Sequence, residues 1–136
     1  MKFSNEISLK TIQLLMVIII LAMAVSGWAY ENKSSDQNGV RVQITPIVLS
    51  PNKAAQFKLR INTHSVELGQ DLTVVAELRD DQDRTYKALQ WKGSPPGGHH
   101  RSGKLTFEAL HTTVREVTLI IREVGGVDQR VFSWKI

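Results

Sequence analysis

The strongest constraint on the fold is a period of two in the apolar side chains, which runs from Val40 to the C-terminus. The clearest example is 56–62, where Phe57, Leu59 and Ile61 alternate with polar neighbours. Successive side chains of a strand point to opposite faces, so this pattern is typical of a strand with one buried face. Since no later stretch repeats apolar residues at intervals of three and four, we expect no long helix after residue 40.

Short runs of this kind recur with turn-forming residues between them. We expect seven strands, at 40–49, 56–62, 72–79, 85–91, 105–110, 116–122 and 131–136. Asp80–Asp83 would close the hairpin between the third and fourth strands, and strands without crossover helices pair antiparallel. The predicted fold class is all-β, an antiparallel immunoglobulin-like β-sandwich of about seven strands, preceded by one N-terminal hydrophobic helix.

An apolar run near the N-terminus indicates export. Lys2 and Lys10 precede Leu14–Val25, which carries no charge. A basic start followed by an apolar stretch is the layout of a secretory signal peptide. The longer stretch Ile12–Tyr30 has 19 residues, is broken only by Gln13, Ser26 and Gly27, and is close to the length that crosses a bilayer. An uncleaved membrane anchor is therefore the alternative. In both cases the lysines favour a cytoplasmic start, which places the remainder outside the cytoplasm.

These patterns divide the chain of 136 residues into three parts. We expect a signal peptide or membrane anchor at 1–30, a flexible polar linker at 31–39 and an extracytoplasmic β-sandwich domain at 40–136. The chain has no cysteine, which excludes disulfides, thiolate metal ligands and cysteine nucleophiles. About 100 residues are enough to bury a core by packing alone.

The net charge of +4 does not indicate nucleic-acid binding. Lys and Arg are scattered through the expected strands, and no dense basic stripe or reading motif is visible. We therefore expect the membrane as a partner through the N-terminal segment, a protein or cell-surface partner for the domain, and no nucleic acid.

The most unusual segment is the loop expected over Trp91–Gly103, which combines prolines, glycines and two adjacent histidines. Imidazoles are common ligands of copper, zinc and nickel, so a metal site built from His64, His99 and His100 is one hypothesis. Adjacent histidines of an extended chain point to opposite faces, so both reach one ion only if the loop turns. The alternatives are that one imidazole caps loop backbone while the others are solvated, or that the histidines form a pH-responsive surface.

Catalytic patterns are weak. The sequence has no nucleophile elbow and no paired carboxylates in a catalytic frame, so Ser65 beside His64 and Ser102 near His100 are the only candidates. The acidic run Asp80–Asp83 lacks the glycine and the distant glutamate of a calcium loop and is read as a turn. We expect no enzyme.

Three further stretches form a recognisable set: Asn62–Leu68 with its Thr-His-Ser element, Gly97–Gly103 with its Gly-Gly-His-His element, and Phe132–Trp134. Together they resemble a family of uncharacterised exported prokaryotic β-sandwich domains. The resemblance covers about residues 55–136 and implies the domain boundary and the histidine loop, but no activity. An acidic residue is expected before Thr-His-Ser, where this chain has Asn62. If that position is a carboxylate ligand in the family, an ion bound here would lose charge compensation.

Two functions are therefore expected. The first is an exported or membrane-anchored, non-enzymatic binding module that contacts its ligand through its loops. The alternative is an extracytoplasmic metal-binding protein that holds copper or zinc with the histidine cluster.

Overall fold

The computed structural model describes residues 8–14, 16 and 29–136. Residues 9–14 and 16 are helical, and the predicted apolar run Leu14–Val25 otherwise lies outside the described residues. Within the described ranges, no helix combines the length and the apolar character needed to cross a bilayer. The signal peptide or anchor therefore stays a prediction.

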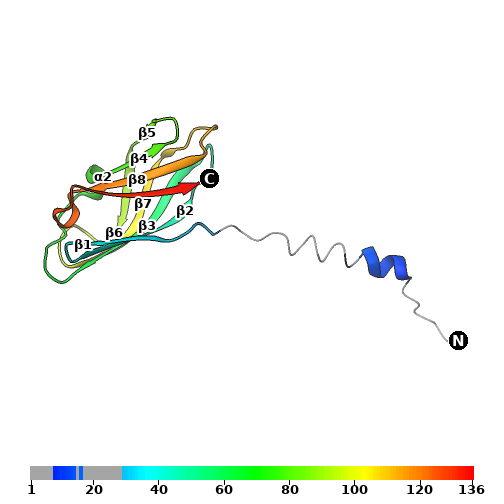
Figure 1. Ribbon diagram of the computed structural model, residues 1–136, viewed down its shortest axis with the longest axis horizontal. Coiled ribbons are helices and arrows are strands. Elements are labelled where there is room, and N and C mark those ends of the chain that lie inside the picture. Colours follow the sequence, from blue (N-terminus) through cyan, green and yellow to red (C-terminus); the bar gives the residue numbers. More distant parts are fainter. Residues whose placement is uncertain (1–7, 15, 17–28) are drawn as a thin grey trace.

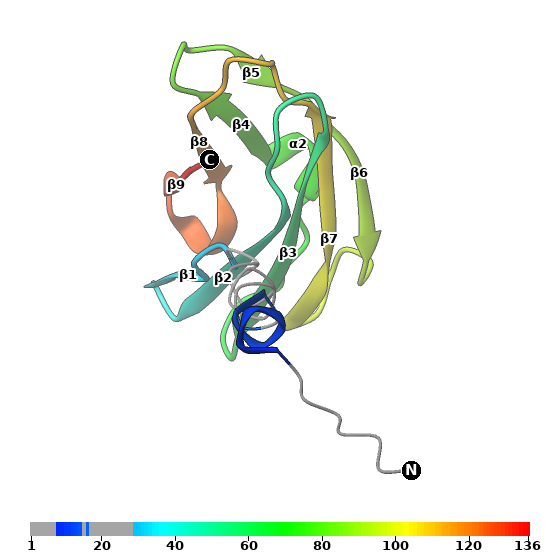
Figure 2. The same cartoon turned by 90° about the vertical axis from the view of Figure 1, so that its right-hand side faces the viewer.

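The chain from residue 33 onward forms two antiparallel sheets that pack face to face (Figures 1 and 2). One sheet has the order β1-β2-β3-β7-β6 and the other β5-β4-β8-β9. The strands are β1 Lys33–Gln37, β2 Val40–Val48, β3 Ala54–Thr63, β4 Ala76–Asp80, β5 Thr85–Tyr86, β6 Ala88–Gly93, β7 His100–Ala109, β8 Glu116–Arg122 and β9 Gln129–Lys135. A one-turn helix, α2 Leu72–Val75, and a 3-10 turn, η1 Val124–Gly126, complete these elements. The predicted antiparallel β-sandwich is confirmed, with nine strands in place of about seven.

Alternate side chains of both sheets fill the space between them. Phe57 of β3 lies at the centre, with its ring centroid 5.8 Å from Phe107 of β7 and 5.4 Å from Trp134 of β9. The inward residues of the other strands, among them Ile44 and Leu119, are fully buried. This core fixes the face on which every remaining strand residue lies, because a strand buried on one side exposes the other.

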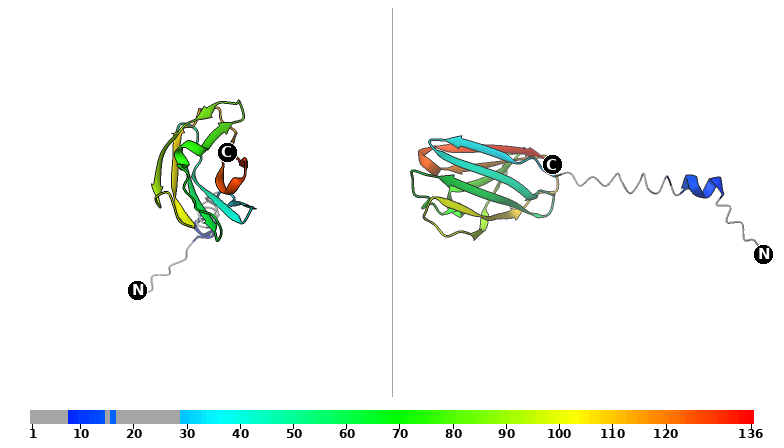
Figure 3. Two further views of the ribbon diagram at one scale, coloured as in Figure 1. Left: turned by 90° about the vertical axis from the view of Figure 1, so that its left-hand side faces the viewer. Right: turned by 90° about the horizontal axis from the view of Figure 1, so that it is seen from below.

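The strands run lengthwise between two ends of the domain (Figures 1 and 3). At one end, here called the entry end, residues 29–33 lead into β1 beside the C-terminus. At the opposite, distal end lie the β1–β2 turn, η1 and the loops before α2 and β7. Backbone bonds join these loops, with Leu68 N donating to Gly98 O at 2.9 Å and Gly97 N to Leu68 O at 2.8 Å.

The segment 31–39 differs from the flexible linker that its polar sequence predicts, because it contains β1. This strand pairs antiparallel with β2 from Lys33↔Ile44 to Gln37↔Val40. Arg130 of β9, 1% exposed, donates to the carbonyls of Ser35, Gln37, Val40 and Val124. Backbone pairing and a buried guanidinium thus order a segment that has almost no apolar side chains.

Two further elements differ from the predicted ones. The segment 72–79 begins as helix α2, because the carboxylate of Asp71 accepts hydrogen bonds from the amide and hydroxyl of Thr73 at 2.9 and 2.7 Å. The predicted strand 85–91 is divided at Lys87, so that β5 pairs with β4 and β6 pairs with β7 in the other sheet. The chain crosses between the sheets at this point.

Candidate functional site

The predicted loop over Trp91–Gly103 is shorter than expected, because β7 already begins at His100. Its residues 100–105 pair with β3 from Asn62↔His100 to Phe57↔Leu105. The loop is therefore limited to residues 94–99. The loop sequence alone could not predict these limits, because β7 begins where it pairs with β3.

The structure brings two of the three predicted metal ligands together. The imidazole centroids of His64 and His100 lie 6.3 Å apart at the distal end, and both side chains are exposed. His100 Nδ1 lies 2.9 Å from Asn62 Oδ1. Asn62 therefore orients an imidazole, a role that the sequence did not suggest. The backbone carbonyl of His99 accepts from Thr63 N at 3.0 Å. No set of three or more His, Cys, Asp or Glu within the described residues has the arrangement of a metal site.

A buried arginine holds the loop beneath these histidines. Arg101 is 2% exposed and donates from Nη1 to Gln70 O at 2.6 Å and Leu68 O at 3.3 Å. Its guanidinium lies 5.6 Å from the Trp91 ring centroid, and Trp91 Nε1 donates to Ser94 O at 2.8 Å. Burial lowers the pKa of Arg101 from its ordinary value. Trp91 thus packs at the margin of the core, and Arg101 is a structural residue.

Basic side chains lie close together on the outer surface of the five-stranded sheet, among uncharged polar residues. Register places Lys58 of β3 opposite Lys104 of β7, and Lys104 opposite Lys92 of β6. These three residues are here called the lysine row. Arg60, two residues after Lys58, lies in the next row opposite Ser102. A third row contains His100, Asn62 and Arg41. Residues that are distant in sequence therefore form one basic surface, which corrects the impression of scattered charge.

This basic surface lacks acidic compensation. Like charges directly opposite each other in a sheet destabilise it. Within the described part of the chain, Lys58, Lys92, Lys104 and Arg60 form no ion pair, and the surface's single ion pair joins Arg41 to Asp36 at 2.9 Å. A shallow hollow of about 420 Å³ lies at its distal edge, lined by Arg60, Asn62, Ser94, His100, Arg101 and Ser102.

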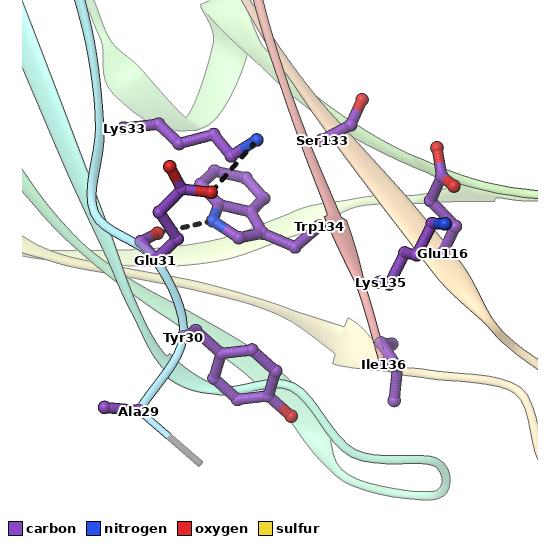
Figure 4. A pocket seen from close by; sticks show the side chains of 9 residues that line it. All are labelled: Ala29, Tyr30, Glu31, Lys33, Glu116, Ser133, Trp134, Lys135 and Ile136. Carbon is purple, nitrogen blue, oxygen red and sulfur yellow. Dashed lines mark hydrogen bonds and ion pairs between the residues drawn. The ribbon is translucent and has the colours of Figure 1, made fainter.

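A larger hollow lies elsewhere, at the entry end between β1 and β9 (Figure 4). It measures about 820 Å³ and is lined by residues 29–31, 33, 116 and 133–136. Trp134 Nε1 donates to Glu31 O at 2.7 Å, Lys33 lies 5.9 Å from the Trp134 ring centroid, and Lys33 pairs with Glu31 at 3.8 Å. The Tyr30 hydroxyl donates to Leu49 O. The contacts of Glu31 and Lys33 with Trp134 connect the start of β1 to β9. We therefore assign these polar groups a structural role.

The other predicted candidates have structural partners. Asp80 is buried and accepts from Gln82 N, Arg84 N, Arg84 Nε and the Tyr86 hydroxyl, so the acidic run is a hairpin turn as predicted. Ser102 N donates to Ser94 Oγ. Among the hydrogen bonds of the described residues, none joins Ser65 or Ser102 to a histidine.

His111 lies at the opposite end from the other histidines and is exposed, with Nδ1 3.0 Å from Thr113 Oγ1. The described residues thus contain a basic surface whose lysines form no ion pair, and an imidazole pair at its edge. Comparison of the chain with protein-family models, with curated proteins and with solved structures finds no match.

Proposed function

We propose that this protein is an exported or membrane-anchored, non-enzymatic binding module that binds an acidic ligand on the outer surface of its five-stranded sheet. The lysine row carries the proposal. Three lysines in direct cross-strand register, with no acidic partner among the described residues, cost stability, and neither core packing nor hydrogen bonding explains them. An acidic ligand would neutralise the repulsion between these lysines, so ligand binding accounts for the arrangement.

The position outside the cytoplasm belongs to the proposal. Lys2 and Lys10 before the apolar run support it. An immunoglobulin-like arrangement is also part of it. If β2 to β9 are lettered A, B, C, C′, D, E, F and G, the two sheets have the orders β1-A-B-E-D and C′-C-F-G. Apart from the added edge strand β1, these orders support that assignment.

Retention of the full-length protein on immobilised heparin, in neutral detergent, tests the surface. The variant K58Q/K92Q/K104Q removes three charges from the row, and the matched control R79Q/R122Q/K135Q removes three from the outer surface of the other sheet. We expect the first variant to elute at clearly lower salt than the second. Equal shifts for both would attribute retention to net charge and would contradict the proposal.

A copper or zinc site at the histidine pair is the second candidate. Asn62 Oδ1 can accept the Nδ1 proton of His100, which would leave Nε2 free, and metal-ligating imidazoles are commonly oriented in this way. The surroundings weigh against it, because Arg41 and Arg60 lie next to Asn62 in the sheet and would repel a cation.

Calorimetric titration of the full-length protein with copper, zinc and nickel separates the two functions. A metal site requires binding tighter than roughly 1 μM, about 8 kcal/mol, that is lost in H64A and H100A. Heparin retention that survives in these two variants, with no metal binding in the wild type, is the result expected from an anion-binding surface.

A further inference from the structure

We infer that the ligand of the basic surface is a flexible polymer of closely spaced phosphate groups, which crosses the strands along the lysine row. This inference rests on the proposed function and deepens it by naming the class of ligand. It follows from the spacing of the charges, from the polar groups between them and from the side chains that the surface lacks.

The spacing of the basic groups favours a polymer over a single anion. Neighbouring strands lie about 4.8 Å apart, so Lys92, Lys104 and Lys58 are attached within roughly 10 Å along a line across the sheet. Residues two apart on one strand are separated by roughly 7 Å, which places Arg60 in a second row. One phosphate contacts only part of this array, whereas a chain of phosphates neutralises it in succession.

The polar groups between the charges are suited to phosphate oxygens. The positions next to Arg60 hold Ser102 in β7 and Gln43 in β2, and those next to the lysine row hold Thr45 in β2. Hydroxyl and amide groups can all donate to anionic oxygens. The hollow bounded by Arg60, His100 and Ser102 can receive one acidic group where the polymer leaves the rows.

The scarcity of exposed apolar side chains around the rows distinguishes this polymer from two other acidic partners. Between Gln90 and the distal end, the outward positions of β3, β7 and β6 within the described residues contain no Phe, Tyr, Trp or large aliphatic residue, and Leu89 of β6, 61% exposed, lies next to this area. Single-stranded nucleic acid is commonly bound by stacking on aromatic side chains. Membrane surfaces are bound most firmly where apolar groups enter the lipid. A phosphate polymer without bases requires neither.

The test uses the full-length protein in nanodiscs of neutral lipid, with inorganic phosphate, tripolyphosphate, longer polyphosphate and an unstructured DNA oligonucleotide of similar charge as probes. We expect affinity to rise on the order of tenfold or more from tripolyphosphate to the longer chain, because additional groups bind at high effective concentration. In K58Q/K92Q/K104Q the slope of log affinity against log salt should decrease by about two to three, as for the loss of three phosphate contacts.

A footprint locates the polymer. Polyphosphate should protect Lys58, Lys92 and Lys104 from an amine-modifying reagent and leave Lys53 and Lys135 reactive. DNA that binds as tightly as polyphosphate would overturn the choice of polymer. Protection of the lysine row by nanodiscs of anionic lipid alone, without protection by polyphosphate in neutral discs, would assign the surface to a membrane.

The outcomes separate the inference from the proposed function. Heparin retention that depends on the row, combined with polyphosphate affinity that does not depend on chain length, would retain the binding surface and reject the polymer. Failure of both measurements would reject both.

Discussion

The outer surfaces of the two sheets differ in whether their charged side chains form ion pairs. On the four-stranded sheet, Glu77 of β4 accepts from Arg79 at 2.6 Å and from Arg122 of β8 at 3.2 Å. Glu116 of β8 lies opposite Lys135 of β9. On the five-stranded sheet, the lysine row has no such partners within the described residues. The same chain therefore contains a surface whose charges stabilise the fold and a surface whose charges oppose it.

Side chains in ion pairs contribute to the stability of the fold, whereas side chains without an ion-pair partner are available to bind a ligand. Exposed ion pairs contribute little each, but they leave few free charges. Uncompensated lysines cost some stability and leave every ammonium group free. The comparison can be tested from both sides, by breaking the compensation on one sheet and by supplying it on the other.

The largest effect on stability is expected where compensation is buried, at the end of β4. Asp80→Asn places an amide NH₂ against the Arg84 guanidinium and the Tyr86 hydroxyl, which now donate to the carboxylate at 2.7 and 2.6 Å. We expect the free energy of unfolding to fall by about 2–3 kcal/mol. Denaturant unfolding measures this loss. The exposed Asp83→Asn should change stability little, and an equal loss in both variants would show that the buried bonds are not the cause.

The same carboxylate gives stability a pH dependence. Burial raises the pKa of Asp80, but hydrogen bonds from Tyr86 and Arg84 outweigh it and lower the pKa from 3.8 to about 2. A depressed pKa stabilises the fold above the unfolded value and loses this contribution as pH falls through the folded value. The difference in unfolding free energy between wild type and Asp80→Asn should therefore shrink between about pH 4 and pH 2.

Supplying compensation to the lysine row is expected to have the next largest effect, and with opposite signs for binding and stability. Lys104→Glu places a carboxylate between Lys58 and Lys92. Stability should rise by about 0.5–1 kcal/mol, because two repulsive cross-strand pairs become attractive. Polyphosphate affinity should fall roughly tenfold, about 1.4 kcal/mol. Chemical denaturation and titration measure the two quantities, and a variant that lost both would indicate damage to the fold.

Removing compensation from the other sheet is expected to change stability alone. Glu77→Gln leaves Arg79 and Arg122 without their shared carboxylate, and we expect a loss of about 1 kcal/mol. Hydrogen bonds from Arg79 lower the pKa of Glu77 against the opposing effect of burial, so the contribution is lost at acidic pH. The exposed Glu67→Gln is the control. Polyphosphate affinity should stay unchanged. A loss of affinity would show that the four-stranded sheet takes part in binding, which contradicts the proposed location of the binding surface.

Much of the sandwich could be predicted from alternation alone. Val117, Leu119 and Ile121 of β8 are buried as their spacing requires, because each strand exposes one face to the core. The alternation of apolar residues did not predict β1. The position of this strand depends on hydrogen bonds from Arg130, a residue near the other end of the chain. It also placed the start of β7 too late, because pairing with β3 and not local apolar content decides where that strand begins.

The candidate surface was missed for a related reason. The parity of Lys58 and Arg60 shows that both lie on the exposed face of one strand. That Lys104 and Lys92 extend this face depends on the strand order β3-β7-β6, in which β3 and β7 are neighbours although four other elements separate them in sequence. Conversely, the presence of several histidines suggested a metal site, whereas the sheet register places Arg41 and Arg60 close to His100.

The smallest expected effect is the change that salt causes in the electrostatic contributions of the two surfaces. Between about 0.1 and 1 M NaCl the Debye length falls from about 10 to about 3 Å, so repulsion within the lysine row and attraction around Glu77 both weaken. The stabilisation gained by Lys104→Glu and the stability lost by Glu77→Gln should each shrink, by about 0.5 kcal/mol. Both variants are compared with the wild type in the same salt, so that general salt effects on burial cancel. A gain in Lys104→Glu that did not change with salt would mean that packing, and not charge, limits the stability of the five-stranded sheet, and the contrast between the two surfaces would lose its electrostatic basis.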